Sequence, residues 1–143
     1  MRLLTILIVA LSGSVLTALA DGSAITISDP YLRESIPGQS RTAGFFTVVN
    51  EGASDCVLAS AQSATAERLE IHEHSHQDGV MRMRQVPSLT IPAGQSVTLS
   101  PGGYHLMVFG TKAPYQAGEQ VPVTLDFGDC GELDALFDVR KIR

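Results

Sequence analysis

Short runs of β-prone residues, separated by turn residues, recur along almost the whole chain after residue 21. The runs are rich in Val, Ile, Thr, Leu and Phe, and no segment among them has the periodicity of a helix. They predict strands near residues 24–28, 44–50, 57–62, 68–74, 80–86, 96–99, 104–109, 121–127 and 133–139. The turn signals between them include Pro37-Gly38, Asn50-Glu51-Gly52, Asp78-Gly79 and Pro101-Gly102-Gly103. Many short strands at this spacing predict an all-β chain, a β-sandwich or Greek-key barrel, and 143 residues suit a single domain.

The first twenty residues have the pattern of a secretory signal peptide. Arg2 gives a short positive start, residues 3–11 are apolar, and Ala18-Leu19-Ala20 supplies the small-x-small cleavage pattern. An uncleaved membrane anchor is the alternative, but residues 3–20 are barely long enough to span and contain several polar positions. We therefore expect a signal peptide at residues 1–20, cleaved after Ala20, and a β domain at residues 21–143 with no membrane attachment after cleavage.

The charge balance argues against nucleic acid as a partner. The whole chain has a net charge of −5, which becomes −6 when Arg2 is removed with the leader. No basic cluster offsets this mildly acidic surface, and the chain has no tryptophan for a stacking platform.

Two cysteines, Cys56 and Cys130, are the only ones in the chain. An even number in an exported protein favours a disulfide, and closing so long a loop would stabilise the fold by about 4 kcal/mol. A pair of thiolate metal ligands or a redox pair is the alternative, although no C-x-x-C spacing supports it.

The stretch "IHEHSHQDGVMRMR", residues 71–84, holds three of the four histidines and two of the four methionines. Asp78-Gly79 predicts a two-residue hairpin turn. That turn pairs Gln77 with Val80, and counting outward places His76 opposite Met81, His74 opposite Met83 and His72 diagonal to Met83. All five imidazole and thioether side chains would then share one face, each within about 8 Å of a neighbour.

This register has a cost on the other face of the hairpin. Leu69 and Ile71 are expected to face the core, so the same register sends Arg82 and Arg84 inward, where burial is costly. A shift of one residue would instead separate the methionines from the histidines. We expect the end of the hairpin to project past the edge of the core, so that both of its faces are exposed to solvent there.

A second segment, "YHLMVFG", places another histidine and methionine together. His105 and Met107 alternate with apolar neighbours and so share one face of a strand, about 6.6 Å apart. Taken alone, this pair also fits a packed histidine and a core thioether.

Together the two segments give the spacing H-x10-M-x21-H-x-M at His72, Met83, His105 and Met107. This spacing resembles the signature of the periplasmic copper chaperones called PCu(A)C. The flanks "AGFFTVVNEG", "DGVMRMR", "IPAGQSVTLSPGGYHLMVFG" and "VPVTLDF" also resemble that family, and the similarity covers essentially the whole mature chain.

The resemblance implies a cupredoxin-like Greek-key β-barrel that binds one Cu(I) through those two imidazoles and two thioethers. It implies a monomeric periplasmic chaperone without enzymatic activity that delivers copper to an acceptor such as cytochrome oxidase. The chemistry agrees, because soft, uncharged thioether sulphur selects Cu(I) over Zn(II), Mg(II) or Ca(II). The cysteine pair is not part of the family signature, and the His- and Met-rich tail of many relatives does not follow the last predicted strand.

Other functions are compatible with parts of the pattern. Copper buffering, storage or uptake would use the same ligands, as would a Cu(II)- or Zn(II)-binding module. An electron-transfer blue copper protein needs a cysteine ligand, and a copper oxygenase of the N-terminal histidine type needs a histidine where the predicted mature chain has Asp21. A structural sandwich would leave the four-residue spacing as coincidence.

His74, His76 and Met81 are left outside the four-residue signature. His74 and His76 could form a weak second site for Cu(II), because imidazole without thioether suits Cu(II) or Zn(II) better than Cu(I). Such binding would be lost as the histidines protonate near their ordinary pKa of about 6.5. The alternative is a pair of solvated histidines near a turn.

Overall fold

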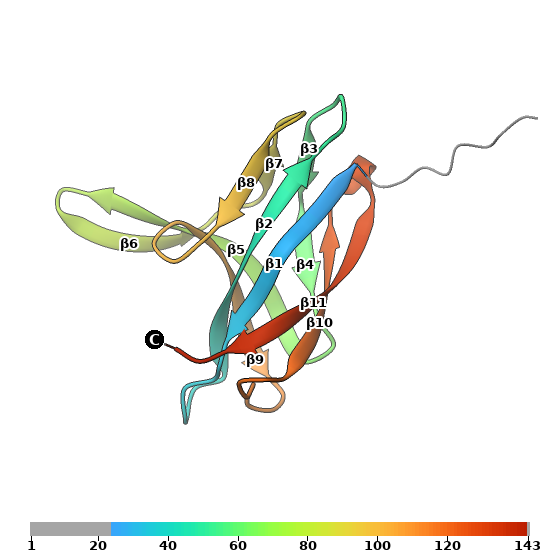
Figure 1. Ribbon diagram of the computed structural model, residues 1–143. Coiled ribbons are helices and arrows are strands. Elements are labelled where there is room, and N and C mark those ends of the chain that lie inside the picture. Colours follow the sequence, from blue (N-terminus) through green and yellow to red (C-terminus); the bar gives the residue numbers. More distant parts are fainter. Residues whose placement is uncertain (1–23, 143) are drawn as a thin grey trace, which may run out of the picture.

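The computed structural model describes residues 24–142, which form eleven strands and one short 3₁₀ turn, η1 (Figure 1). The elements are β1 (Ile25–Arg33), β2 (Arg41–Asn50), β3 (Cys56–Leu58), β4 (Ser60–Gln62), β5 (Ala66–Gln77), β6 (Val80–Gln85), β7 (Leu89–Ile91), β8 (Ser96–Leu99), β9 (Tyr104–Thr111), β10 (Gln120–Asp126), η1 (Gly128–Cys130) and β11 (Glu132–Arg140). Within these residues no helix is long and apolar enough to cross a membrane. The predicted signal peptide, residues 1–20, and the predicted new N-terminus at Asp21 lie outside the described residues.

Seven of the strands close into a barrel. The hydrogen-bonded order runs β1-β11-β10-β4-β5-β9-β2, and β2 returns to β1 to complete the ring. The β1–β11 pair is parallel, whereas the other pairs of the ring are antiparallel. β8 extends the sheet from β2, and β6 pairs with the outer half of β5. The predicted all-β barrel is confirmed.

The barrel interior is filled by every second residue of its strands. In β9, Leu106 and Val108 are buried, and in β5 the same is true of Leu69 and Ile71. Because neighbouring side chains of a strand point to opposite faces, the residues between them lie on the outside of the barrel. His72 and His105 are among those outward residues, so the core positions the candidate ligands without including them.

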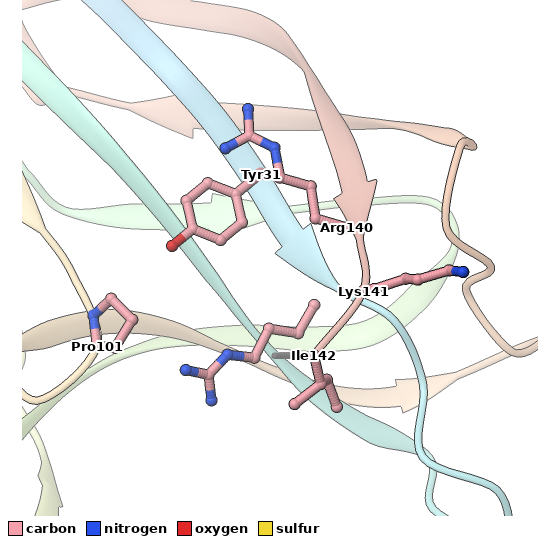
Figure 2. A pocket seen from close by; sticks show the side chains of 6 residues that line it. Tyr31, Pro101, Arg140, Lys141 and Ile142 are labelled. Carbon is pink, nitrogen blue, oxygen red and sulfur yellow. The ribbon is translucent and has the colours of Figure 1, made fainter.

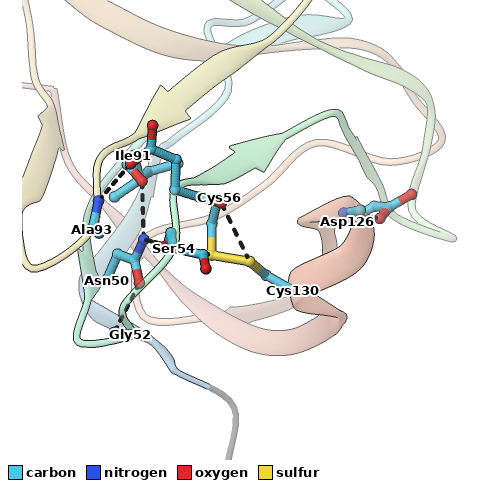
Figure 3. Close-up of a disulfide and its surroundings, with 10 residues drawn as sticks. Asn50, Gly52, Ser54, Cys56, Ile91, Ala93, Asp126 and Cys130 are labelled. Carbon is cyan, nitrogen blue, oxygen red and sulfur yellow. Dashed lines mark hydrogen bonds between the residues drawn. A yellow bond between two sulfur atoms is a disulfide. The ribbon is translucent and has the colours of Figure 1, made fainter.

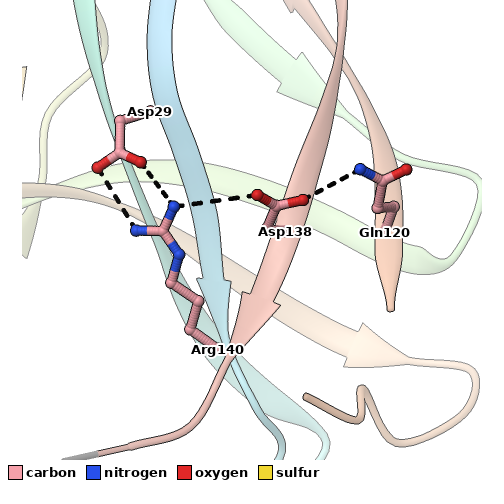
Figure 4. Close-up of polar contacts among 4 residues, drawn as sticks. All are labelled: Asp29, Gln120, Asp138 and Arg140. Carbon is pink, nitrogen blue, oxygen red and sulfur yellow. Dashed lines mark hydrogen bonds and ion pairs between the residues drawn. The ribbon is translucent and has the colours of Figure 1, made fainter. Parts of the chain in front are cut away.

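Strand β1 continues well past the point where the sequence predicted its end. The pair Asp29-Pro30 has the composition of a turn, but here it forms an irregularity in the β1–β2 register between Ser28 and Tyr31. Asp29 adopts a φ of 50°, which lets the strand bulge and then resume. The Asp29 carboxylate also contacts Arg140 of β11 at 2.6 Å, and Arg140 lies 3.9 Å from Asp138 (Figure 4).

The strand predicted at residues 57–62 is two strands that belong to different sheets. β3 pairs with β7 in a small two-stranded sheet, whereas β4 pairs with β10 in the barrel. At the break, the Ala59 N–H donates to the Asp126 carbonyl at 2.8 Å. No Gly or Pro marks this switch, and the short strand β7 was not predicted, because both depend on partners far away in the sequence.

A disulfide joins Cys56 of β3 to Cys130 of η1 (Figure 3). It links the small sheet to the connection between β10 and β11. The predicted bridge is confirmed, and the alternative in which the two cysteines act as thiolate ligands is excluded.

Asn50, fully buried at the end of β2, is expected to be a main contributor to stability near this bridge. Its side-chain amide donates to the carbonyls of Ser54 (2.8 Å) and Ile91 (3.0 Å) and accepts from the Gly52 N–H at 3.0 Å (Figure 3). Asn50→Ala leaves these backbone groups without partners, so we expect the free energy of unfolding to fall by about 2–3 kcal/mol. Urea denaturation measures it, and a loss below about 0.5 kcal/mol would show that water replaces the amide.

Candidate metal centre

The β5–β6 hairpin has the predicted register. His74 lies opposite Met83, His76 opposite Met81 and Gln77 opposite Val80. The hairpin reaches away from the barrel (Figure 1), and every residue of β6 is exposed. The inward-facing arginines therefore meet no core, and Arg84 pairs instead with Glu73 at 2.5 Å. The expected projection of the hairpin past the core is confirmed.

The outer face of β5 and β9 brings the two predicted histidine segments together. His72 lies directly opposite His105 in the antiparallel register, and Glu70 lies opposite Met107. The imidazole of His105 has its ring centre 5.8 Å from that of His72 and 5.1 Å from that of His74. Three imidazoles thus gather on one patch of the barrel surface, which the hairpin extends.

His105 is the most deeply buried of these side chains, with 3% of its surface exposed. Its Nδ1 lies 3.3 Å from the Gly103 carbonyl, which can only accept, so Nδ1–H is the donor and Nε2 keeps its lone pair. The same carbonyl accepts the backbone N–H of His74 at 3.4 Å. Burial lowers the pKa of His105 below its usual range, and this favours the neutral imidazole that a metal requires.

His72 is held by a carboxylate. Its Nε2 lies 2.8 Å from Oε2 of Glu70, and this hydrogen bond is the main cause that lowers the pKa of Glu70. An ionised carboxylate only accepts, so Nε2 carries the proton and Nδ1 carries the lone pair. Nδ1 of His72 is buried and has no hydrogen-bond partner in the described part of the chain. A carboxylate that orients an imidazole whose other nitrogen is unpartnered matches the surroundings of histidine ligands in metal sites.

A pocket of about 230 Å³ lies beside these residues, and two imidazoles and two thioethers line it. They belong to His74, Met83, His105 and Met107, and the remaining lining comes from Arg33, Ala43, Phe45, Pro101 and Gly102. Three of the four side chains predicted as ligands therefore share one pocket. The fourth, His72, does not line the pocket but lies beside His105, with 5.8 Å between the ring centres, whereas His74 is among the lining residues. His76 and Met81 lie outside this pocket, at the exposed end of the hairpin.

A larger hollow of about 860 Å³ adjoins the pocket and is unsuited to a metal ion. Arg33, Arg140 and Lys141 line it together with Tyr31, Pro101 and Ile142 (Figure 2). Half of these six residues are cationic, so the hollow repels a metal cation. Arg33 and Pro101 also line the smaller pocket, so the two hollows are neighbours.

The donor set of the smaller pocket is soft and uncharged. Among residues 24–142, no three His, Cys, Asp or Glu side chains are placed to hold one metal ion together. The neutral donors that line this pocket are imidazole nitrogen and thioether sulphur. Such a ligand set favours a soft monovalent ion over Zn(II), Mg(II) or Ca(II).

The sequence profile of the LpqE-like family, described as "Putative lipoprotein LpqE-like", matches residues 25–139. The chain belongs to this family. A protein of Leifsonia xyli subsp. xyli (strain CTCB07), named "Putative lipoprotein Lxx21020", is 37% identical over 111 residues, which are 77% of this chain and 64% of that protein. This LpqE-like chain spans less than two thirds of the length of the curated relatives that it matches.

Solved PCuAC structures share the fold of this LpqE-like chain. The "Copper-bound PCuAC domain from PmoF2" superposes with a TM-score of 0.71 at 24% identity, covering 87% of this chain and 97% of that one. The "Solution structure of CuI-DR1885 from Deinococcus Radiodurans" gives a TM-score of 0.65 at 30% identity, covering 80% and 76%. The predicted membership of the PCu(A)C group and its cupredoxin-like barrel are confirmed.

Proposed function

We propose that this LpqE-like protein binds one Cu(I) and carries it to a copper-accepting protein. The observation that carries this proposal is the pocket on the outer face of β5 and β9, which two thioethers and two imidazoles line. Beside it, Nδ1 of His72 is buried and finds no hydrogen-bond partner in the described part of the chain. A solved relative with the same fold is named as a CuI form, which supports the same ion here. The proposed ligands are His72, Met83, His105 and Met107, with His74 at the wall of the same pocket.

The ligand chemistry suits a carrier better than an enzyme. Four neutral donors leave only the single positive charge of Cu(I), which a half-exposed site tolerates, and they avoid a thiolate that would hold copper too tightly. Met83 is 48% exposed at the mouth of the pocket, so a partner can reach the ion. The two cysteines are joined in a disulfide and neither lines this pocket, so neither is available there as a thiol nucleophile.

The proposed location is the periplasm, reached through the signal peptide at residues 1–20 with cleavage after Ala20. The family and a relative are both named as lipoproteins, which is consistent with export. A disulfide also fits an oxidising compartment. The proposed acceptor is the copper subunit of cytochrome oxidase or one of its assembly factors, and the proposed oligomeric state is a monomer.

Copper titration of the purified exported protein tests this function. We expect one equivalent of Cu(I) to bind in the presence of reductant, with an X-ray absorption spectrum that contains both nitrogen and sulphur donors. Zn(II) titrated in parallel is expected to bind far more weakly. Tight Zn(II) binding with no Cu(I) uptake would instead support the Cu(II)/Zn(II) module.

A transfer experiment separates a carrier from a storage or buffering protein. The Cu(I)-loaded protein is mixed with the purified copper-free soluble domain of the oxidase copper subunit, and the two are separated before metal analysis. We expect copper to be found on the oxidase domain. Copper that stays on the loaded protein would support storage.

A further inference from the structure

We propose that His72 and His74 are alternative donors for one coordination position of the copper site. The chain then offers five donors to a four-coordinate ion, and two of them exchange. This inference rests on the proposed copper function and deepens it, because it states how the ion moves within the site. The family spacing includes only the first of these two histidines.

His74 is placed to bind without any change in its surroundings. It lies directly opposite Met83 in the hairpin register, and with Met83, His105 and Met107 it completes two imidazoles and two thioethers around one pocket. Its ring centre is 5.1 Å from that of His105, closer than the 5.8 Å that separates His72 from His105. Its side chain makes no hydrogen bond or ion pair within residues 24–142, so nothing there holds the ring in another direction.

His72 is placed to bind in a different way. It is turned toward Glu70 and Phe109, with its Nε2 bound to the carboxylate and its ring centre 5.9 Å from the Phe109 ring. It is not among the residues that line the pocket, yet its Nδ1 is buried and has no hydrogen-bond partner among residues 24–142. Buried polar atoms in proteins almost always have a hydrogen-bond or metal partner. A soft metal ion bound to the neighbouring His105 would be such a partner for Nδ1 of His72.

The two histidines do not act together with His105 as a three-imidazole site. Residues 24–142 contain no group of three His, Cys, Asp or Glu side chains that converge on one ion. His72 and His74 are two residues apart on one strand face, where His72 lies opposite His105 of β9 and His74 lies opposite Met83 of β6. The geometry therefore favours coordination of the ion by only one of these two histidines at a time.

The exchange needs no proton or electron. One neutral imidazole nitrogen forms a bond to Cu(I) while the other neutral imidazole nitrogen releases it, and the ion stays Cu(I) throughout. His72 is anchored on the barrel by Glu70, whereas His74 lies on the hairpin beside the exposed Met83. The His72-bound state is thus the inner one, and the His74-bound state presents the ion toward a partner.

A double-mutant cycle tests the proposal. Cu(I) affinity is measured by competition with a chromogenic Cu(I) chelator for the wild-type protein and for His72→Ala, His74→Ala and the double variant. Each single change is expected to lower the affinity by about tenfold or less, because the other histidine replaces the lost donor. The double change is expected to lower it by more than about 100-fold, well beyond the sum of the single effects. X-ray absorption of both single variants should still show two nitrogen and two sulphur donors.

His76→Ala is the matched control, since His76 has the same face and strand but lies outside the pocket, and it should bind like the wild-type protein. Circular dichroism confirms that each variant is folded, and His72→Leu, which fills the same space, replaces His72→Ala if that variant unfolds.

If His74→Ala has no effect in either background, the proposal is wrong. If His74→Ala and His76→Ala each remove a second equivalent of copper and spare the first, the separate second site is supported instead. A wild-type protein that binds no Cu(I) would contradict the proposed function itself, whereas the other outcomes leave it standing.

Discussion

Replacing Met83 or Met107 by leucine is expected to lower the Cu(I) affinity at least about tenfold while the protein stays folded. Leucine nearly conserves the volume of methionine but removes the soft sulphur that selects Cu(I). Met83 is half exposed, so Met83→Leu should change the free energy of unfolding by less than about 0.5 kcal/mol. Met107 is partly buried, and its change should cost less than about 1.5 kcal/mol.

Chelator competition gives the affinity, and urea denaturation of the copper-free protein gives the stability. Met81→Leu is the matched control, because Met81 is 55% exposed on the same strand but lies outside the pocket. It should leave Cu(I) binding unchanged. If both pocket variants bind Cu(I) normally but unfold at lower denaturant, the two methionines are packing residues and the ligand assignment is wrong.

Removing the disulfide with Cys56→Ala and Cys130→Ala is expected to lower the free energy of unfolding by about 4 kcal/mol. The bridge spans a sequence separation of 74 residues, and the reduced unfolded chain regains the freedom that this loop closure removes. Cu(I) affinity should be unchanged, since neither cysteine lines the pocket.

Urea denaturation of three samples checks the effect: the oxidised wild-type protein, the reduced wild-type protein and the double variant. The last two should agree within about 1 kcal/mol, which separates the loss of the bond from the loss of packing at buried Cys56. Free thiols found by alkylation of the native exported protein would contradict the bridge. Loss of Cu(I) binding in the double variant would place the cysteines in the metal site after all.

The strand pattern and the hairpin register follow from local sequence. Asp78-Gly79 has the backbone freedom for a two-residue turn, with Asp78 at a φ of 52° and Gly79 at 75°. Once that turn is set, counting outward gives every pair of β5 and β6 as it is found. Alternation along β9 likewise places His105 and Met107 on the outer face, because the period of a strand does not depend on its partners.

Strand partners and breaks depended on contacts that no local pattern contains. Residues 57–62 look like one β-prone run, yet they form parts of two strands that belong to different sheets. β3 pairs with β7 and β4 pairs with β10, and both partners lie far along the chain. Asp29-Pro30 has turn composition but is a bulge, because the strand regains its pairing with β2 beyond it. In both places tertiary pairing outweighed local preference.

The candidate site likewise combines features that follow from local sequence with features that depend on tertiary contacts. The sequence by itself determined that the chain is all-β and favoured a disulfide between its two cysteines, because these follow from composition and from the spacing of the turns. It also predicted the sheet face of each histidine and methionine, because turn chemistry and a period of two place them. Only the tertiary structure decided which way each imidazole turns within that face. The Glu70 carboxylate accepts a hydrogen bond from the His72 ring and so orients it. The Gly103 carbonyl, in the loop before β9, accepts from both the His105 ring and the backbone N–H of His74. Strand alternation specifies a face but not a direction within it, and that direction depends on contacts between strands that meet only in the folded barrel.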